Sequence, residues 1–194
     1  KIKYRDLFES ASDIVLAVGS QGEIIDINRR AEELTGFTRQ ELLEMNVLRD
    51  LTVAEDRDRI RQVIANLIKG LRQVYEVRWR TKDGTILLFE GSSSARMTKE
   101  GKFLCTRCIL RDITERKKAE KALKESEVLL REAQRVSHVG SWVLNVVTGK
   151  LSWSDETYRI YGFKPQEFVP TYEKFSSIVH PDDNKFVQEE INSA

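Results

Sequence analysis

Residues that ligate metals or act as nucleophiles are scarce in this chain, whose 194 residues include two cysteines and two histidines. Two cysteines cannot build a disulfide framework, which favours a reducing compartment. No apolar run approaches the roughly 18 residues of a membrane span, and no signal peptide is present. We therefore expect a cytoplasmic protein. Because the chain starts at Lys1 and stops at Ala194 without a terminating motif, we expect an excerpt whose parent could still be membrane-anchored.

An excess of charge of either sign is also lacking. Lys and Arg number 32 against 31 Asp and Glu, which gives a formal net charge of +1. A chain without a basic field is not expected to bind nucleic acid. The sequence also lacks a phosphate-binding glycine loop, a kinase His box and an ATP-binding segment. Catalysis is therefore expected only in a parent chain.

The scarce cysteines and histidines suggest no metal site. Cys105 and Cys108 have C-x-x-C spacing, but residues i and i+3 of a strand point to opposite faces, so the two thiols cannot grip one metal. We expect one thiol to face inward and the other outward, and an enzyme that uses the pair stays open as a rival function. His180 opens a His-Pro-Asp-Asp motif that suits a helix start better than a metal or phosphoacceptor site.

Hydrophobic periodicity predicts an α+β fold in the first half. Asn28 is expected to cap a short helix, and Thr38 with Glu41 forms a capping box for a second one. The predicted order is β-β-α-α-α-β-β-β, which fits a five-stranded antiparallel sheet with short helices on one face. The expected strands are residues 13–18, 24–27, 73–80, 85–97 and 103–111, and the longest helix of this half runs from 53 or 54 to 68.

A charged helical stretch follows. Residues 115–135 contain seven Lys or Arg and five Glu, without Gly or Pro. Small or apolar residues recur along it with alternating spacings of three and four, which is a heptad pattern. One interpretation is a solvated spacer helix; the other is a parallel dimeric coiled coil that carries a signal. The seam consists of Ala119, Ala122, Ser126, Leu129, Ala133 and Val136.

Four motifs in order give the first half a family resemblance. They are Ala11-Ser12-Asp13-Ile14, the run Asn28 to Phe37, Lys82-Asp83-Gly84, and the run Asp112 to Lys117 that begins Asp-Ile-Thr. With these motifs, residues 4–118 resemble a PAS domain with its C-terminal PAC segment. The resemblance implies a pocket for a small ligand or cofactor, frequent dimerisation, and a pairing of Asp112 with Arg116 that locks the last strand to the outgoing helix.

The second half repeats the first. Gly162-Phe163 follows Gly36-Phe37 by 126 residues, and Gln166-Glu167 follows Gln40-Glu41 at the same offset. This half resembles a PAS_3-type fold that stops inside its long helix. We therefore expect a PAS/PAC domain at residues 1–114, a signalling helix at 115–139, and the N-terminal part of a second PAS domain at 140–194.

The resemblance also disfavours two cofactors. Flavin photoreceptors of the family have a reactive Cys directly after the Asn that is Asn28 here, and this chain has Arg29. Haem-binding members commonly use a His on the long helix, and residues 54–68 contain none. The cofactor stays unknown: a small organic ligand, or none.

A set of apolar positions forms the candidate pocket wall, although these residues could equally fill the core. Arg107, if it points inward, would indicate an anionic ligand. The apolar candidates are Leu16, Val18, Ile27, Phe37, Leu48, Ile60, Ile64, Val77, Trp79 and Phe89.

The predicted function is that of a sensory input module. The parent protein we expect is a histidine kinase of a two-component system, because tandem PAS arrays usually precede one. Alternatives are input to a cyclic-dinucleotide enzyme or a transcriptional regulator, and a ligand-free PAS module that serves dimerisation or protein interaction. A homodimer through the connector helix and the PAS domain is expected. The expected relay residues are Asp112, Ile113, Thr114 and Arg116.

Overall fold

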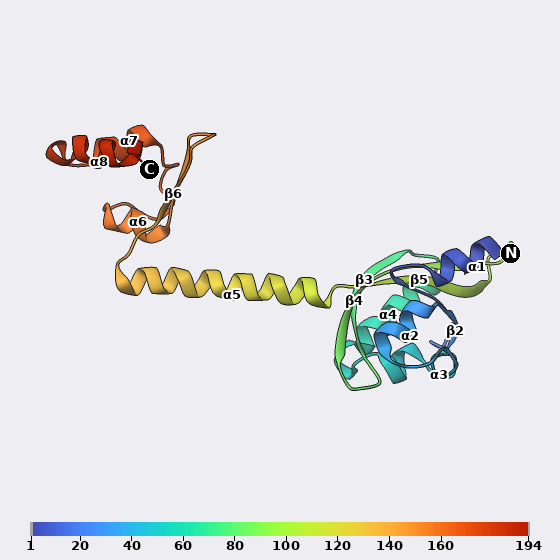
Figure 1. The fold of residues 1–194 in the computed structure, drawn as a ribbon. Helices are drawn as coiled ribbons and strands as arrows, with labels where there is room; N and C mark the ends of the chain where they lie inside the picture. The colour runs from blue at the N-terminus through green and yellow to red at the C-terminus, as the bar shows by residue number, and fades with distance from the viewer. Residues whose placement is uncertain (1, 194) are drawn as a thin grey trace. The chain divides into compact units, whose positions relative to one another are not determined.

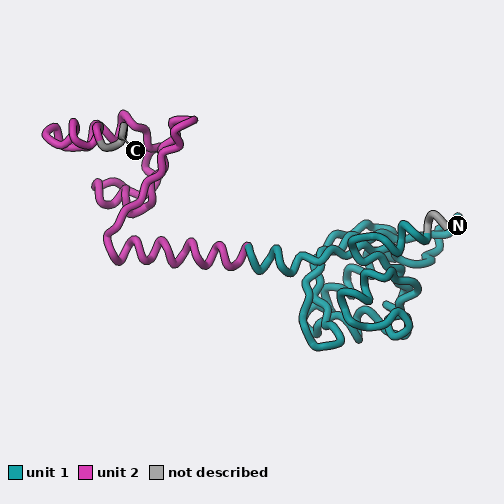
Figure 2. The backbone as a smooth tube through the Cα atoms, in the orientation of Figure 1, with its two compact units in different colours: residues 1–119 teal, residues 120–194 magenta. Residues whose placement is uncertain are grey.

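The computed structural model describes the backbone of residues 2–193 and the side chains of 5–187 and 189. The chain forms two compact units, residues 1–119 and 120–194 (Figure 2). No helix in the described part of the chain is long and apolar enough to span a membrane.

The first unit is built on a five-stranded antiparallel sheet, as the sequence predicts (Figure 1). The strand order β2-β1-β5-β4-β3 puts the last strand in the centre, between the first strand and the fourth. The strands are β1 (Ile14–Val18), β2 (Ile24–Ile27), β3 (Gln73–Arg80), β4 (Ile86–Met97) and β5 (Phe103–Asp112).

The helical segments between β2 and β3 cover the inner face of this sheet. The capping box of Thr38 and Glu41 is present, so this prediction is confirmed. A π-helical turn, η1, was not predicted; the Asn46 side chain accepts hydrogen bonds from two of its backbone amides. The helical segments are α1 (Ile2–Glu9), α2 (Arg29–Thr35), α3 (Arg39–Leu43), η1 (Val47–Leu51), the 3₁₀ turn η2 (Ala54–Asp56) and α4 (Arg57–Ile68).

Asn28 has a different role from the predicted helix cap. Its side chain makes no cap hydrogen bond to α2. Instead it is fully buried, accepts from Val15 N at 3.0 Å and donates to the carbonyls of Phe8 (3.1 Å) and Asp13 (3.0 Å). Because these bonds satisfy both ends of the amide, the Asn28 side chain joins the end of α1 to strand β1, and only the backbone of Asn28 contributes to the start of α2.

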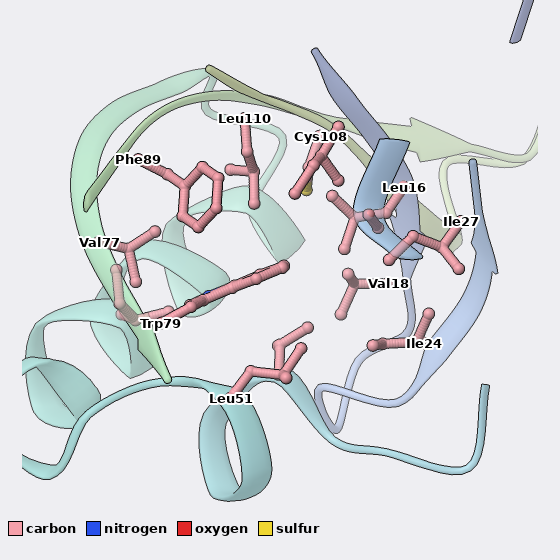
Figure 3. Packing of buried hydrophobic residues seen from close by; sticks show 14 of the residues in the cluster. Leu16, Val18, Ile24, Ile27, Leu51, Val77, Trp79, Phe89, Cys108 and Leu110 are labelled. Atoms are coloured by element: carbon pink, nitrogen blue, oxygen red, sulfur yellow. The ribbon is translucent and has the colours of Figure 1, made fainter. Parts of the chain in front are cut away.

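The core lies between the sheet and these helices (Figure 3). Alternate residues of β1 point inward, and Leu42, Leu51 and Leu67 pack on them from the helical side. Trp79 and Phe89 meet edge to face, with ring centroids 5.3 Å apart. Figure 3 shows the Trp79 ring extending across the middle of the core.

Helix α5 (Thr114–Ser137) begins two residues after β5 ends and crosses from the first unit into the second. Its 24 residues give it a length of roughly 36 Å. The long connector helix that the charged stretch predicts is thereby confirmed.

The second unit contains a hairpin and three helices. Its strands β6 (Trp142–Asn145) and β7 (Lys150–Trp153) form a two-stranded antiparallel sheet. Trp153 contacts the rings of Tyr158, Tyr161, Phe168 and Phe175, so this unit packs around one aromatic cluster. Its helices are α6 (Asp155–Ile160), α7 (Tyr172–Ile178) and α8 (Pro181–Ser193).

A buried carboxylate joins the start of α4 to strand β3. Asp56 accepts hydrogen bonds from Arg78 N (2.9 Å), Nε (3.1 Å) and Nη2 (2.9 Å), and Arg59 Nη2 lies 3.1 Å away. Because the Asp56 side chain is 8% exposed, the hydrogen bonds from Arg78 replace water around its charge. Together they lower the pKa of Asp56 from 3.8 to about 2.

We expect Asp56→Asn to lower the free energy of unfolding of the first unit by about 1–2 kcal/mol at neutral pH, a figure that allows for solvent screening at the partly exposed Arg78. The folded-state pKa is below the unfolded one, so the contribution is present above about pH 4 and is lost as the pH falls through about 2. Urea unfolding followed by the NMR signals of β3 measures it.

The matched control is Asp58→Asn, because the Asp58 side chain is 93% exposed and pairs with Arg61. The free energy of unfolding of this variant should match that of the wild type at neutral and at acidic pH. An Asp56→Asn penalty that is the same at neutral and acidic pH would contradict the assignment.

Candidate functional site

A cavity lies inside the first unit, between the inner face of the sheet and α4. It is small: the space in it that is open to the centre of a water-sized sphere is about 30 Å³. The lining is largely apolar and comprises Leu16, Val18, Val47, Thr52, Ile60, Val63, Ile64, Leu67, Tyr75, Val77, Trp79, Thr106, Cys108 and Leu110.

Six of the predicted wall residues line this cavity: Leu16, Val18, Ile60, Ile64, Val77 and Trp79. The other four apolar candidates belong to the surrounding core. Ile27 and Phe89 are fully buried, whereas Phe37 and Leu48 are partly buried and pack against the core. Sequence periodicity therefore identified inward-facing residues without separating cavity wall from filled core.

Arg107 does not point inward. It is exposed and lines a depression on the outer face of the sheet with Arg72 and Ser92. Strand alternation explains this placement, since the neighbours Thr106 and Cys108 are the inward residues of β5. The hint of an anionic ligand that depended on an inward Arg107 is therefore removed.

Polar side chains that the sequence analysis missed form one end of the cavity. Tyr75 Oη lies 2.9 Å from Ser93 Oγ, and Thr106 Oγ1 lies 3.3 Å from Cys108 Sγ. Thr106 also donates to Val18 O at 3.2 Å. We call Tyr75, Ser93, Thr106 and Cys108 the polar cluster. Alternation within β4 and β5 could have indicated it, because Ser93, Thr106 and Cys108 all sit at buried positions of their strands.

The two cysteines lie on opposite faces of β5, with Cys108 at an inward position and Cys105 at an outward one. Cys108 is buried, Cys105 is half-buried, and both are free thiols. Burial raises the pKa of the Cys108 thiol, which keeps it protonated and unreactive. Among the described residues, no group of three His, Cys, Asp or Glu is placed to hold a metal ion.

Residues at the exit of the sheet bond to strand β4. Ile113 N donates to Leu88 O at 2.9 Å, and Leu88 N donates to Thr114 Oγ1 at 2.8 Å. Asp112 Oδ1 accepts from Thr114 N at 2.8 Å, and Ile113 is 2% exposed. The first residues of α5 are therefore fixed to β4 by directional bonds as well as by their chain connection to β5.

Two ion pairs add to this anchor. Lys117 Nζ lies 3.0 Å from Glu76 Oε1 on β3, and Arg116 Nη2 lies 3.9 Å from Glu90 Oε2 on β4. All four side chains are half-exposed, so each pair contributes little to stability alone. The Asp112–Arg116 pairing that the resemblance implies stays a prediction.

Comparison with known families agrees with this architecture. A family model described as PAS domain matches residues 12–115, which is more than half of the chain. A second model, described as PAS fold, matches residues 150–194.

Individual relatives cover the chain to different extents. The Escherichia coli protein named probable diguanylate cyclase DgcE is 21% identical over 193 residues, which is 98% of this chain and 17% of that protein. Sporulation kinase C of Bacillus subtilis is 30% identical over 134 residues, 68% of this chain and 31% of that protein. The chain thus spans less than a third of either relative. A PAS domain structure from Colwellia psychrerythraea is 26% identical with a TM-score of 0.53, and the match covers 59% of this chain and 97% of that one.

We expect iodoacetamide to alkylate Cys105 faster than Cys108 by about tenfold or more, because Cys108 is buried and its pKa is raised. Peptide mass spectrometry over a time course of the native chain measures both rates. The Cys105→Ser variant should then incorporate label only at the slow rate. Equal rates, or a disulfide between the two thiols under mild oxidation, would support the cysteine-pair enzyme instead.

Proposed function

Because this chain belongs to the PAS family, we propose that it is the sensory input segment of a larger signalling protein, in which the state of the cavity controls the start of α5. The functional segments are then the PAS/PAC domain at residues 1–114, the signalling helix at 115–139 and the first part of a second PAS domain at 140–194. A cytoplasmic location belongs to the same proposal.

One continuous path of contacts carries the proposal. Trp79 lines the cavity and packs edge to face on Phe89 at 5.3 Å. Phe89 is the neighbour of Leu88 on β4 and pairs with Asp112 in the sheet register. Leu88 N in turn donates to the side chain of Thr114, the first residue of α5, and Leu88 O accepts from the backbone of Ile113 just before it.

A change in the cavity can therefore reach the helix along β4. A ligand that moves the Trp79 ring would shift Phe89, and with it the Leu88 peptide groups that hold Ile113 and Thr114. The ligand must interact differently with two arrangements of this path, since equal binding to both would shift neither. In this mechanism Arg116 acts through its pair with Glu90, and Asp112 orients the first turn.

For the output, a histidine kinase is favoured and a cyclic-dinucleotide enzyme is the alternative. Sporulation kinase C has the higher identity, whereas the probable diguanylate cyclase matches across both units. A transcriptional regulator is the third class of parent.

A homodimer through α5 is part of the proposal. Leu129 and Val136 of the heptad seam are 65% and 81% exposed, so the helix carries an apolar stripe that a second copy can cover. A ligand-free module that serves only dimerisation is the second candidate, and the small size of the cavity favours it.

We expect Trp79→Phe to shift the amide NMR signals of Leu88, Ile113 and Thr114 and to change the hydrogen-exchange rate of the Lys117 amide severalfold. The physical reason is that a smaller ring loosens the contact with Phe89 and hence the position of β4. Combining it with Thr114→Val, which removes the acceptor for Leu88 N, should give a non-additive effect of about 0.5 kcal/mol or more on Lys117 exchange.

Trp153→Phe is the matched control, because it makes the same change in the aromatic cluster of the second unit. It should leave the Leu88 and Thr114 signals in place. Additive effects of Trp79→Phe and Thr114→Val, or no response of α5 to either, would refute transmission along β4.

For the dimer, we expect Leu129→Lys to weaken self-association of the full chain by about tenfold or more, because it buries a charge in the proposed seam. Analytical ultracentrifugation measures the dissociation constant. Val128→Lys places the same charge one residue outside the seam and should change it little. A monomeric wild type, or equal effects of both variants, would contradict dimerisation through this helix.

A further inference from the structure

The polar cluster consists of two hydrogen-bonded pairs at the cavity. Tyr75 pairs with Ser93, and Thr106 pairs with Cys108. The carbonyl oxygen of Val18 extends the second pair, because it accepts from Thr106. Tyr75, Thr106 and Cys108 face the cavity, while Ser93 lies behind them at 2% exposure.

The protons of this cluster can be counted. Each of the four groups has one proton, and Val18 O can only accept, so the Thr106 proton is used there. The contact between Thr106 and Cys108 then takes the thiol proton. Of Tyr75 and Ser93, the phenol is the more acidic group and the stronger donor, so it donates to Ser93. The three groups that face the cavity have thus used their protons, and the fourth proton belongs to Ser93 behind them. The cluster therefore presents lone pairs to the cavity.

No charge balances a charged ligand here. None of the residues that line the cavity is Asp, Glu, Lys, Arg or His. Burial also raises the pKa of Tyr75 and of Cys108, so both stay neutral. An ion would lose its hydration without gaining a counter-charge, which is costly in an apolar site.

The position of the Tyr75 ring depends on Gly91, which has no side chain. A Cβ at Gly91 would lie 2.7 Å from the Tyr75 ring atoms and 3.0 Å from Leu110 Cδ2. The ring therefore lies flat over β4 because the residue opposite it in the sheet register is glycine. This packing holds the Tyr75 oxygen at the polar end of the cavity.

We propose that the cavity binds a small, uncharged molecule with an apolar body and one hydrogen-bond donor, such as an alcohol, a phenol or an N–H heterocycle, whose proton is accepted at the Tyr75 oxygen. This inference rests on the proposed sensory function and names the ligand class for it. The space of about 30 Å³ open to water-sized centres limits the body to about one ring, with slight movement of the wall.

Four one-ring probes test the donor requirement on the full chain at neutral pH: phenol, fluorobenzene, pyridine and benzoate. Fluorobenzene has nearly the shape of phenol without its donor, pyridine only accepts, and benzoate is an anion. We expect phenol to shift the methyl NMR signals of Leu16, Val18 and Val77 saturably, and benzoate to leave them unchanged. Pyridine should bind more weakly than phenol.

The decisive variant is Tyr75→Phe, which removes the accepting oxygen and keeps the ring over Gly91. We expect it to weaken phenol binding about tenfold and to leave fluorobenzene affinity unchanged, so that the phenol-to-fluorobenzene ratio falls by the same factor. Ser94→Ala is the control, since Ser94 lies next to Ser93 on β4 but faces the outer side of the sheet. It should alter neither affinity.

An unchanged ratio in Tyr75→Phe, tighter binding of pyridine than of phenol, or no cavity signal shifted by any probe would overturn the ligand class. These outcomes are separate from the relay itself. If Trp79→Phe still changes Lys117 exchange while no probe binds, the proposed input function survives and the ligand class does not. If phenol binds as described but α5 does not respond, the relay fails and the ligand class stands.

Discussion

The alternation of side chains along β5 is the constraint on which the rest of the first unit depends. This strand lies in the centre of the sheet, and its inward residues Thr106, Cys108 and Leu110 form one wall of the cavity. Its outward residues lie on the exposed face, and its C-terminal end leads directly into α5. A shift of β5 by one residue would exchange the two faces and would put Arg107 into the core. The register with β1 and β4 therefore determines both the chemistry of the cavity and the start of the helix.

Much of the fold could be predicted because local patterns decide it. The five strands, the capping box at Thr38 and the connector helix each leave a signal of period two, of capping chemistry or of period 3.6. The roles of individual polar residues could not be predicted in the same way. Asn28 has the right residue type for a helix cap, but its partners are Val15, Phe8 and Asp13, which only the folded chain brings near. The π-helical turn at Val47–Leu51 likewise depends on the fold around Asn46.

The candidate site shows more clearly the same difference between features that local sequence patterns decide and features that only the folded chain decides. Periodicity identified apolar residues that face inward, but the difference between cavity wall and filled core depends on side-chain packing across five elements. Tyr75 illustrates this, because its position follows from a glycine on the neighbouring strand and not from its own sequence context. Leu88 was missed for a similar reason: an apolar strand residue gives no sign that its backbone holds the next helix. Of the proposed relay residues, Ile113 and Thr114 are hydrogen-bonded to Leu88 of β4, and this partner is not apparent from the sequence.

The strength of bonding also changes along α5. In the first turn, hydrogen bonds from Leu88 and the ion pair between Lys117 and Glu76 join the helix to the sheet. Further on, the seam residues are exposed, and four of the six are Ala or Ser, which bury little apolar area in any dimer. A helix that is fixed at one end and only weakly held along its seam can rotate or shift there at small cost in free energy. A strong Leu seam would oppose such a change, so the weakness of the seam fits a helix that transmits a small movement of β4.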